Sequence, residues 1–378
     1  MEPLLFAFCG SLFLCMAIIA TSRIHGHLTH DGGEGIQKIH TAPTPRIGGV
    51  ALFLGALIGG VSLPQQVQAL WWMMCLAMLP AFLAGLLEDL TKRVGVTWRL
   101  LATICSGLIF SLLSGYRIDH VGLPFADWLL SQWGVSLIFT AFAIGGIANA
   151  INIIDGVHGL AAGTAIIILA SLGILSWTYG DMVLLGCILM GMAILLGFLP
   201  LNFPFGKLFL GDAGAYSIGY LLAIIAVALP ERNPEASPVI GLIALAYPVI
   251  ETMVSIWRRL RRAGSHPGQP DRLHLHSLVF RDRARTLARR LGVSHLRNAM
   301  TSVIVWTVPL LAAVFTVFPQ QSSYITLLEF GAVVLAYLYL YRSVALLPVI
   351  FLPQSPRPKT PIPQRRALST VDETSSRG

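Results

Sequence analysis

The sequence predicts an all-α, polytopic integral membrane protein, a helical bundle of about 11 transmembrane helices, and three observations lead to this fold class. Hydrophobic residues make up 55% of the 378 residues and charged residues only 12%, about half the charged fraction of an ordinary soluble domain. The mean hydropathy is +0.73. Apolar runs of about 20 residues, each long enough to cross a hydrocarbon core, recur along the chain. These observations exclude a soluble enzyme and a disulfide-stapled secreted domain.

Each expected span is an apolar run bounded by polar or turn-forming residues. The spans are expected near residues 3–22, 47–63, 69–87, 98–115, 133–152, 159–177, 181–201, 213–230, 238–257, 299–318 and 323–350. The first run lacks the basic start and the cleavage site of a signal peptide, so we expect it to be retained. Residues 1–350 form one transmembrane domain. Residues 351–378, rich in Pro, Ser and Arg, are expected to be a disordered basic tail.

The basic residues predict the orientation of the bundle. Of the 26 Lys and Arg residues, only Arg117 and Arg232 fall in the loops that precede odd-numbered spans. The positive-inside rule therefore places the N-terminus outside and the C-terminus in the cytoplasm. The net charge of +8 lies mostly in one loop, residues 258–297, and in the tail. A basic cytoplasmic surface beside lipid attracts anionic headgroups and phosphates, so we expect no nucleic-acid partner.

Four carboxylates lie at the expected cytoplasmic ends of spans. Glu88 and Asp89 end the third span, Asp155 follows the fifth, and Asp212 precedes the eighth. Ionisable residues at membrane depth are energetically costly, so each one indicates a function by default. Because helix ends on one face can converge, we expect these side chains to build a single site.

The adjacent acids Glu88 and Asp89 repel one another, which favours a proton acceptor beside an ionised neighbour at a metal. An interfacial pair balanced by Lys92 and Arg93 stays open as an alternative. Asp212, flanked by glycines where a helix opens, offers an oxygen ligand for Mg²⁺ together with a phosphate. Its alternative is a plain helix N-cap.

Two polar segments complete the set. Asn149, Asn152 and Asp155 are three residues apart, so they lie along one side of a helix and suit hydrogen bonds to a base or a sugar. Polar helix–helix contact is the alternative, and His158 beside them is ambiguous. In the basic loop, Arg272 precedes His274 and His276.

Cationic and imidazole donors of this kind suit phosphate oxygens. If the two imidazoles act together, the segment is extended, because alternate residues of an extended chain share a side. A zinc site would need a third ligand, and the neighbouring sequence offers none.

In this order, the segments Gly85–Arg93, Asn149–Leu160, Pro204–Gly214 and Pro270–Ser277 resemble the polyprenyl-phosphate N-acetylhexosamine-1-phosphate transferases of glycosyltransferase family 4. Lys38-Ile39-His40 and Pro43–Gly49 resemble the family's basic and Gly-Gly approach to the second span. The resemblance covers roughly residues 35–280. It implies a transferase domain with catalytic cytoplasmic loops in the bacterial inner membrane.

The resemblance implies that a UDP-N-acetylhexosamine meets undecaprenyl phosphate at the cytoplasmic face, and that UMP leaves. The Asp212 position would bind Mg²⁺, with Mn²⁺ as an alternative, and Asp89 would support the metal. Glu88 and Asp89 would deprotonate the lipid phosphate. The nucleotide-sugar pocket would be shaped by Asn149, Asn152 and Asp155, and phosphates would be held by Lys38, Arg272, His274 and His276. The membrane lipid is the expected surrounding, and a homodimer stays open.

Three departures from the family pattern concern its acidic and imidazole motifs. Glu88 stands where the family usually has Asp, His158 replaces the second Asp of its DGxDG motif, and Ser277 replaces the last His of HxHH. Pro270-Asp271-Arg272 resembles the WecA-type branch, which initiates O-antigen or similar surface polysaccharides, more than the MraY branch. GlcNAc is the default sugar, followed by GalNAc or a deoxy-N-acetyl sugar.

Two other functions remain open on the sequence. A transporter of an anionic or lipid-linked solute would place charges near mid-membrane, whereas here they gather at one expected face. A catalytically inactive scaffold of the same fold would explain the three departures, but the retained Asp89, Asp155, Asp212 and His274 argue against it.

Overall fold

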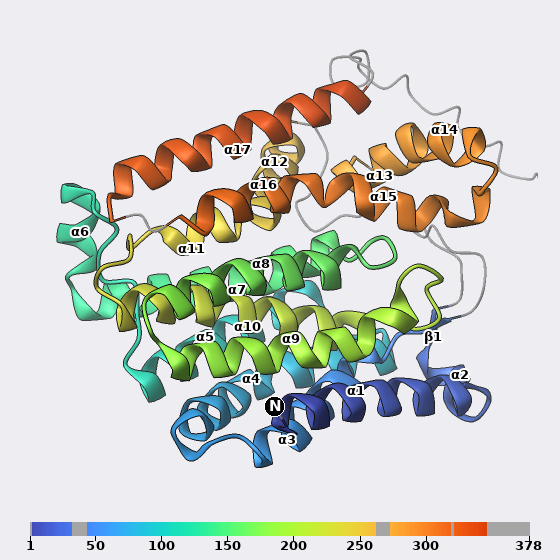
Figure 1. The fold of residues 1–378 in the computed structure, drawn as a ribbon, viewed down its shortest axis with the longest axis horizontal. Helices are drawn as coiled ribbons and strands as arrows, with labels where there is room; N and C mark the ends of the chain where they lie inside the picture. The colour runs from blue at the N-terminus through green and yellow to red at the C-terminus, as the bar shows by residue number, and fades with distance from the viewer. Residues whose placement is uncertain (1, 32–43, 262–272, 319–320, 346–378) are drawn as a thin grey trace, which may run out of the picture.

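The computed structural model describes residues 2–31, 44–261, 273–318 and 321–345 (Figure 1). Within these residues, one short antiparallel pair of strands, β1 (His30–Asp31) and β2 (Thr44–Pro45), accompanies a bundle of helices. The first half of the chain holds α1 (Glu2–Ala20), α2 (Ser22–Thr29), α3 (Gly48–Val61), α4 (Gln65–Thr91), α5 (Val96–Ser114), α6 (Pro124–Leu130) and α7 (Trp133–Ile154). The second half holds α8 (Leu160–Thr178), α9 (Met182–Asn202), α10 (Gly211–Arg232), α11 (Ile240–Ala244), α12 (Ala246–Leu260), α13 (Leu275–Arg281), α14 (Arg283–Arg290), the 3₁₀ turn η1 (Ser294–Leu296), α15 (Arg297–Val305), α16 (Thr307–Thr316) and α17 (Ser323–Val344).

The predicted all-α, polytopic membrane fold is confirmed. Nine helical stretches among the described residues are long and apolar enough to span a membrane, and each coincides with an expected span. The other two expected spans differ in form. Helix α3 is apolar but has only 14 residues, and the span expected near residues 238–257 is divided into α11 and α12. The expected disordered tail, residues 351–378, lies outside the described residues.

Two prolines account for breaks in expected spans. A proline ring clashes with the carbonyl group four residues earlier and offers no N–H to it. For Pro248 that carbonyl belongs to Ala244, where α11 ends. For Pro309 it belongs to Val305, where α15 ends and α16 follows after Trp306. The helices therefore break one turn before each proline.

Helix α10 forms the centre of the bundle. All its residues from Gly211 to Leu229 are buried, and it packs against α3, α4, α7 and α8. A helix that is buried all round is shielded from lipid by its neighbours. Its first residue, Gly211, therefore opens into protein and not into lipid.

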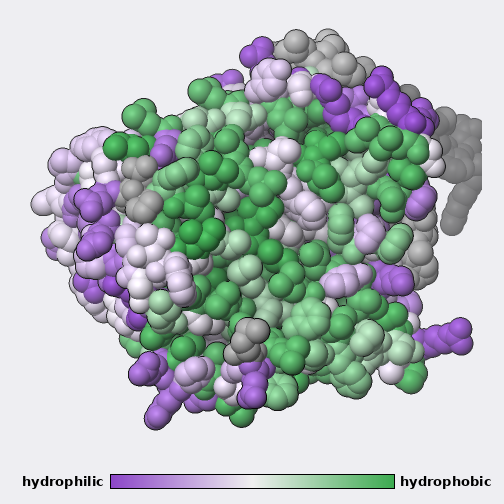
Figure 2. Space-filling model, in the orientation of Figure 1, coloured by the Kyte–Doolittle hydropathy of each residue, from purple (hydrophilic) through white to green (hydrophobic). Residues whose placement is uncertain are grey.

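Short elements gather at the two ends of the bundle. Figure 1 shows α2, the strand pair, α13 and α14 toward one end and α6 at the other. Figure 2 shows hydrophobic side chains over the middle of the visible face and hydrophilic side chains toward its margins. This distribution is typical of a multi-pass membrane protein. The orientation with the N-terminus outside stays a prediction.

Candidate active site

The acidic helix ends converge at the start of α10, as the sequence predicts. Asp89, in the last turn of α4, is fully buried. Its two carboxylate oxygens accept the backbone N–H groups of Asp212 and Ala213, each at 2.9 Å. The first N–H groups of a helix have no partner within the helix, and the positive end of the helix dipole favours an anion there. Asp89 therefore caps α10 from a neighbouring helix.

Glycines allow this close approach. A Cβ atom on Gly85 would lie 2.5 Å from the backbone nitrogen of Ala213. Gly211 has a positive φ of 71°, and a Cβ there would lie 2.4 Å from an Asp89 carboxylate oxygen. Any side chain at either position would push α4 and α10 apart. The glycines that precede Asp89 and Asp212 thus allow the two helices to lie this close together.

Asp212 lies among cationic and polar donors. One of its oxygens, Oδ1, accepts hydrogen bonds from Arg46 Nη2 at 2.8 Å and from Asn152 Nδ2 at 3.2 Å. The other, Oδ2, accepts one from Arg99 and a longer one, 3.5 Å, from the Tyr216 hydroxyl group. Arg46 Nη2 also lies 3.6 Å from Asp89 Oδ1, so its guanidinium group bridges the two acids.

The backbone that carries Arg46 is fixed on the start of α10. The N–H groups of Gly48 and Gly49 donate to the carbonyl groups of Phe209 and Leu210, both at 2.9 Å. The N–H group of Phe209 donates to Pro45, also at 2.9 Å. These bonds join the segment before α3 to the segment before α10. This segment is part of the family resemblance, but Arg46 itself was not among the predicted site residues.

Arg99 was not predicted as a site residue, because an arginine at the start of an expected span is typical of an interfacial flank. It is the fourth residue of α5 and pairs with Asp212, whose side chain is 6% exposed. A signal was nevertheless present. Arg99 is a charged residue inside an expected span, and such residues indicate function by default.

The other predicted acids lie close by without touching Asp212 directly. Glu88 is partly exposed, and its Oε2 accepts the backbone N–H of Val94 at 2.8 Å, beyond the end of α4. Asp155 follows the last residue of α7. Burial raises the pKa of the Asp155 carboxyl to about 7; Arg46 lowers it, and Asp212 and Asp89 raise it. The structure therefore places Asp155 within the electrostatic field of the same site.

Asn149 and Asn152, predicted to share one side of a helix, have different partners. Asn152 donates to Asp212. Asn149 Nδ2 donates to Thr103 Oγ1 at 2.9 Å and to the carbonyl group of Gly145 at 2.8 Å. Asn149 thus makes the polar helix–helix contact that the sequence left open, here between α7 and α5.

The ambiguous His158 has a structural role in this fold. Its backbone N–H donates to Asn298 Oδ1 at 2.7 Å, and its carbonyl group accepts the hydroxyl group of Ser302 at 2.6 Å. Its Nδ1 lies 3.1 Å from the carbonyl oxygen of Pro204. His158 therefore ties the loop after α7 to the loop before α10 and to α15.

The two imidazoles of the basic loop are brought together, but not by an extended segment. His274 is the extended N-cap residue of α13, whereas His276 lies inside that helix. The expectation of a fully extended His274–His276 segment is therefore wrong, because the chain turns into a helix directly after His274. The rings are nonetheless parallel within 4°, with centroids 5.5 Å apart.

His276 reaches the loop that follows Asp155. A Cβ atom on Gly156 would lie 2.3 Å from His276 Nε2. The Nδ1 atom of His276 is buried and has no hydrogen-bond partner among the described residues. Burial lowers the pKa of His276 to about 4, further lowered by His274 and raised by Glu251. Predicted phosphate contacts Lys38 and Arg272 lie outside the described residues.

Glu251 was missed by the sequence analysis. It is fully buried in α12 and accepts a hydrogen bond from His274 Nδ1 at 2.9 Å. The same rule that singled out the four helix-end acids applies to it, since it is an acid inside an expected span. Glu251 was not predicted because only acids at the ends of expected spans were considered.

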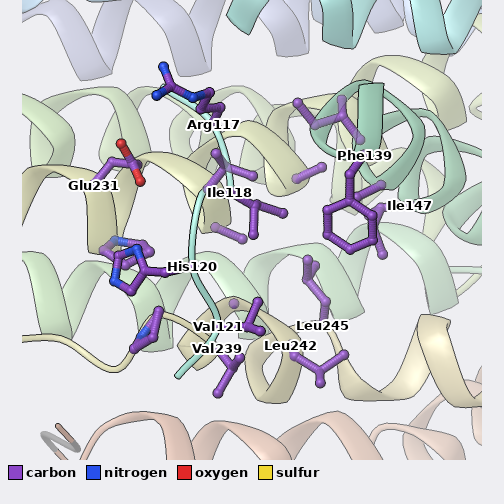
Figure 3. Close-up of a pocket in the computed structure, with 18 of the residues that line it drawn as sticks. Arg117, Ile118, His120, Val121, Phe139, Ile147, Glu231, Val239, Leu242 and Leu245 are labelled. Carbon is purple, nitrogen blue, oxygen red and sulfur yellow. The ribbon is translucent and has the colours of Figure 1, made fainter. Parts of the chain in front are cut away.

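A separate set of polar side chains lies at the other end of the bundle. Asp119, His120 and Glu231 bring possible metal-ligand atoms within 4.8 Å of one another. His120 and Glu231 also line a mostly apolar cavity of about 220 Å³ between α7, α10 and α11 (Figure 3). Glu231 ends the helix that Asp212 begins, 19 residues and about 28 Å away along the axis. This set is distinct from the site at Asp212.

A polar site of acids, arginines and imidazoles at one end of a helical membrane bundle is the architecture of an integral membrane enzyme. The model of glycosyl transferase family 4 matches residues 71–230, which run from α4 to the end of α10. Over these residues the chain is similar to glycosyl transferase family 4, the family that the motifs predict.

The relatives of this chain come from distant bacteria. A Bacillus subtilis (strain 168) protein named "Probable undecaprenyl-phosphate N-acetylglucosaminyl 1-phosphate transferase" is 28% identical over 272 residues, 71% of this chain and 72% of its own length. The undecaprenyl-phosphate alpha-N-acetylglucosaminyl 1-phosphate transferase of Yersinia pestis is 29% identical over 251 residues, covering 65% and 68%. The decaprenyl-phosphate N-acetylglucosaminephosphotransferase of Mycobacterium tuberculosis (strain CDC 1551 / Oshkosh) is 29% identical over 307 residues, 71% of each chain.

Proposed function

We propose that this protein transfers N-acetylhexosamine 1-phosphate, with GlcNAc as the sugar, from a UDP-sugar to undecaprenyl phosphate at the cytoplasmic face of the bacterial inner membrane. The observation that carries the proposal is the cluster around Asp212, where two arginines and a helix N-terminus meet buried acids. The relatives' names supply the substrates, because they act on a polyprenyl phosphate and a GlcNAc 1-phosphate donor.

The reaction exchanges one phosphoanhydride bond for another. An oxygen of the lipid phosphate attacks the sugar-linked phosphorus of the UDP-sugar, the bond from that phosphorus to the bridging oxygen breaks, and UMP leaves. The product is an undecaprenyl diphosphate sugar. Both substrates are anionic, so transfer depends on charge neutralisation and in-line positioning.

The arginines provide the charge that the reaction needs. Arg46, which lies before α3, and Arg99, which lies in α5, both contact Asp212. Planar guanidinium groups hold phosphate oxygens through paired hydrogen bonds. In the proposed reaction, the guanidinium groups of Arg46 and Arg99 release the carboxylate of Asp212 and bind the phosphate oxygens of the substrates.

The remaining predicted residues receive positioning and proton-transfer roles. Glu88 is the accessible member of the Glu88–Asp89 pair and serves as base toward the lipid phosphate, while Asp89 keeps the start of α10 in place. Asn152 and Asp155 face the nucleotide sugar. The imidazoles His274 and His276 hold a phosphate, and the Nδ1 of His276, which has no hydrogen-bond partner within the described part of the chain, is available for it.

The donor set fits the proposed Mg²⁺. Asp212 and Asp89 are carboxylates, the oxygen ligands that Mg²⁺ prefers. The guanidinium group of Arg46, which lies 2.8 Å from one acid and 3.6 Å from the other, already marks the space between them as one that takes positive charge. Mg²⁺, when bound, would neutralise phosphate charge at these acids. Mn²⁺ is the proposed substitute.

The product's place in surface-polysaccharide synthesis follows from its chemistry. A sugar on undecaprenyl diphosphate is a primer, so glycosyltransferases that extend lipid-linked sugars must consume it. We assign the enzyme to the initiation of O-antigen or a similar polymer.

The proposal is tested with purified protein, Mg²⁺, undecaprenyl phosphate and a panel of UDP-sugars that includes UDP-GlcNAc, UDP-GalNAc and their deoxy analogues. We expect release of UMP and formation of a lipid-linked sugar, fastest with UDP-GlcNAc, and loss of both when EDTA removes the metal. If UMP were released only with another UDP-sugar, the assignment of GlcNAc as the transferred sugar would be wrong. No release with any sugar would overturn the function.

A further inference from the structure

Glu251 is a fully buried carboxylate in α12 that no helix-end argument explains. A carboxylate away from water is stable only when its oxygens are fully hydrogen-bonded. Here the Oε1 atom lies 2.9 Å from His274 Nδ1, and the Oε2 atom accepts the Tyr337 hydroxyl group at 2.8 Å. The backbone N–H of Leu275 donates to both oxygens, at 3.2 and 3.3 Å.

These contacts determine where the proton of His274 lies. An ionised carboxylate can only accept hydrogen bonds, so the nitrogen that faces it must carry a hydrogen. His274 Nδ1 is therefore the protonated nitrogen, and Nε2 is the atom that remains for another partner. A carboxylate behind an imidazole fixes both the tautomer and the orientation of the ring, as it does behind catalytic and metal-binding histidines.

Helix α17 holds the same segment from a second side. Tyr337 and Tyr341 are four residues apart, so they share one face of α17, and their ring centroids lie 6.0 Å apart. Tyr337 reaches Glu251, and the Tyr341 hydroxyl group donates to the carbonyl group of Leu273 at 3.1 Å. The residue before His274, the imidazole itself and the residue after it are thus all fixed.

The fixed imidazole connects to the proposed active site. Its ring is stacked on His276, and His276 lies against Gly156 in the loop after Asp155. A rotation of His274 would therefore disturb His276 and that loop. Glu251 controls this chain of contacts from inside the bundle.

We propose that Glu251, supported by Tyr337, is a positioning residue that holds His274 in the tautomer and orientation needed to bind a substrate phosphate. This inference rests on the proposed function, in which His274 contacts a phosphate. Glu251 acts only through His274 and does not touch the substrate. Residues 323–344 of α17 thereby contribute to the site, although they lie far outside the family match at residues 71–230.

The test is a double-mutant cycle on UMP release by the full-length protein with UDP-GlcNAc and undecaprenyl phosphate. We expect Glu251→Gln to lower the rate about 10- to 100-fold, the usual effect of losing the carboxylate behind a functional histidine. In a His274→Ala background the same substitution is expected to cost less than about twofold, because residues that act through one another are not additive. Tyr337→Phe should lower the rate by a few-fold in the wild-type background and have almost no effect in the His274→Ala background.

Thr326→Ala is the matched control. Thr326 is also a buried polar residue of α17, but among the described residues its hydroxyl group bonds only to the carbonyl group of Ser322, one turn earlier in the chain. We expect the wild-type rate for it. If His274→Ala leaves no measurable rate, the same cycle is run on the affinity for UDP-GlcNAc.

The outcomes separate the inference from the proposed function. Full additivity of Glu251→Gln and His274→Ala, or a wild-type rate for Glu251→Gln, would overturn the positioning role while the enzyme stays active. If Glu251→Gln does not fold, the Tyr337→Phe cycle decides. A wild-type protein that releases no UMP from any UDP-sugar would overturn the proposed function itself, and the positioning role with it.

Discussion

The two ends of α10 both hold aspartate–arginine pairs, and they differ in how completely the charges are satisfied. At the C-terminal end, Arg232 binds Asp181 through Nε at 2.6 Å and Nη2 at 2.7 Å, and its Nη1 donates to Tyr116 at 2.8 Å. Asp181 also caps α9 by accepting the N–H of Leu184. Burial alone would raise the pKa of Asp181, but the hydrogen bonds from Arg232 and Leu184 lower it below 3.8.

At the N-terminal end of α10, the buried acids and polar groups are not matched one to one by partners. Asp89 and Asp212 share the guanidinium group of Arg46, and Arg99 pairs with Asp212 alone. Burial raises the pKa of the third acid, Asp155, and the charges of Asp212 and Asp89 raise it further. His276 keeps a buried nitrogen without a partner among the described residues. Such a surplus of buried polar groups is costly unless a ligand satisfies them.

The comparison teaches that an ion pair in a membrane helix does not by itself mark a functional site. The one-to-one pair of Asp181 and Arg232 serves stability, whereas the unbalanced set at Asp212 is suited to charged substrates. Four predictions test this difference, in order of expected effect.

The largest effect is expected for Asp212→Asn. The variant keeps the shape of the side chain but removes the charge that gathers Arg46 and Arg99 and would bind Mg²⁺. We expect the rate of UMP release to fall by about 10³-fold, the scale of losing a principal electrostatic group of an active site. The melting temperature in detergent checks folding. A rate within tenfold of wild type would contradict the assignment of Asp212.

The second prediction concerns the other end of α10. Asp181→Asn leaves the partly buried Arg232 without its anion, and we expect this to cost up to about 3 kcal/mol of unfolding free energy, the lower limit for a fully buried pair. We expect a lower melting temperature in detergent and a normal rate of UMP release per folded molecule. The comparison of the two ends fails if this variant keeps its stability but loses turnover.

A smaller effect is expected for Gly156→Ala. The added Cβ would lie 2.3 Å from His276 Nε2, so the imidazole or the loop must move. We expect about a tenfold lower rate, the cost of misplacing a contact group. Gly146→Ala is the control in α7, since nothing lies within 4 Å of its Cβ position. Equal rates for the two variants would show that His276 is not part of the site.

The smallest effect concerns pH. The pKa of His276 is lowered from 6.5 to about 4 in the folded protein. Between these values the unfolded chain binds a proton that the folded protein does not, so stability falls as the pH decreases from 6.5 toward 4. At pH 5.5 this amounts to about 1 kcal/mol.

We expect His276→Gln to lose part of this pH dependence, which melting curves at pH 7.5 and 5.5 would measure. An unchanged difference between the two curves would assign the effect to other groups.

The sequence predicted the fold and the acidic end of the bundle because both depend on local patterns. Apolar runs define spans without knowledge of their neighbours, and an acid at a span end is visible in the chain itself. Asp89 and Asp212 come together as expected. Even the two divided spans have a local cause, since Pro248 and Pro309 each lie four residues after the end of a helix.

The partners of those acids could not be predicted in the same way. Arg99 meets Asp212, and Glu251 meets His274, only because segments that are distant in the chain pack together. An arginine at a span end also obeys the positive-inside rule, so its sequence context does not distinguish a site residue from a flank. The turn from extended chain to helix at His274 depends in the same way on contacts with Glu251 and Tyr341.

The position of Tyr337 near the end of the described chain has a consequence for biosynthesis. A ribosome releases α17 after every other described helix, so a nascent chain that has inserted α16 already possesses both acids of α4 and α10 and both imidazoles. Glu251 in that intermediate has no phenol to meet. If Tyr337 supports Glu251 as proposed, a chain that has not yet inserted α17 has the acids and imidazoles of the site but reaches its full activity only when that helix is in place.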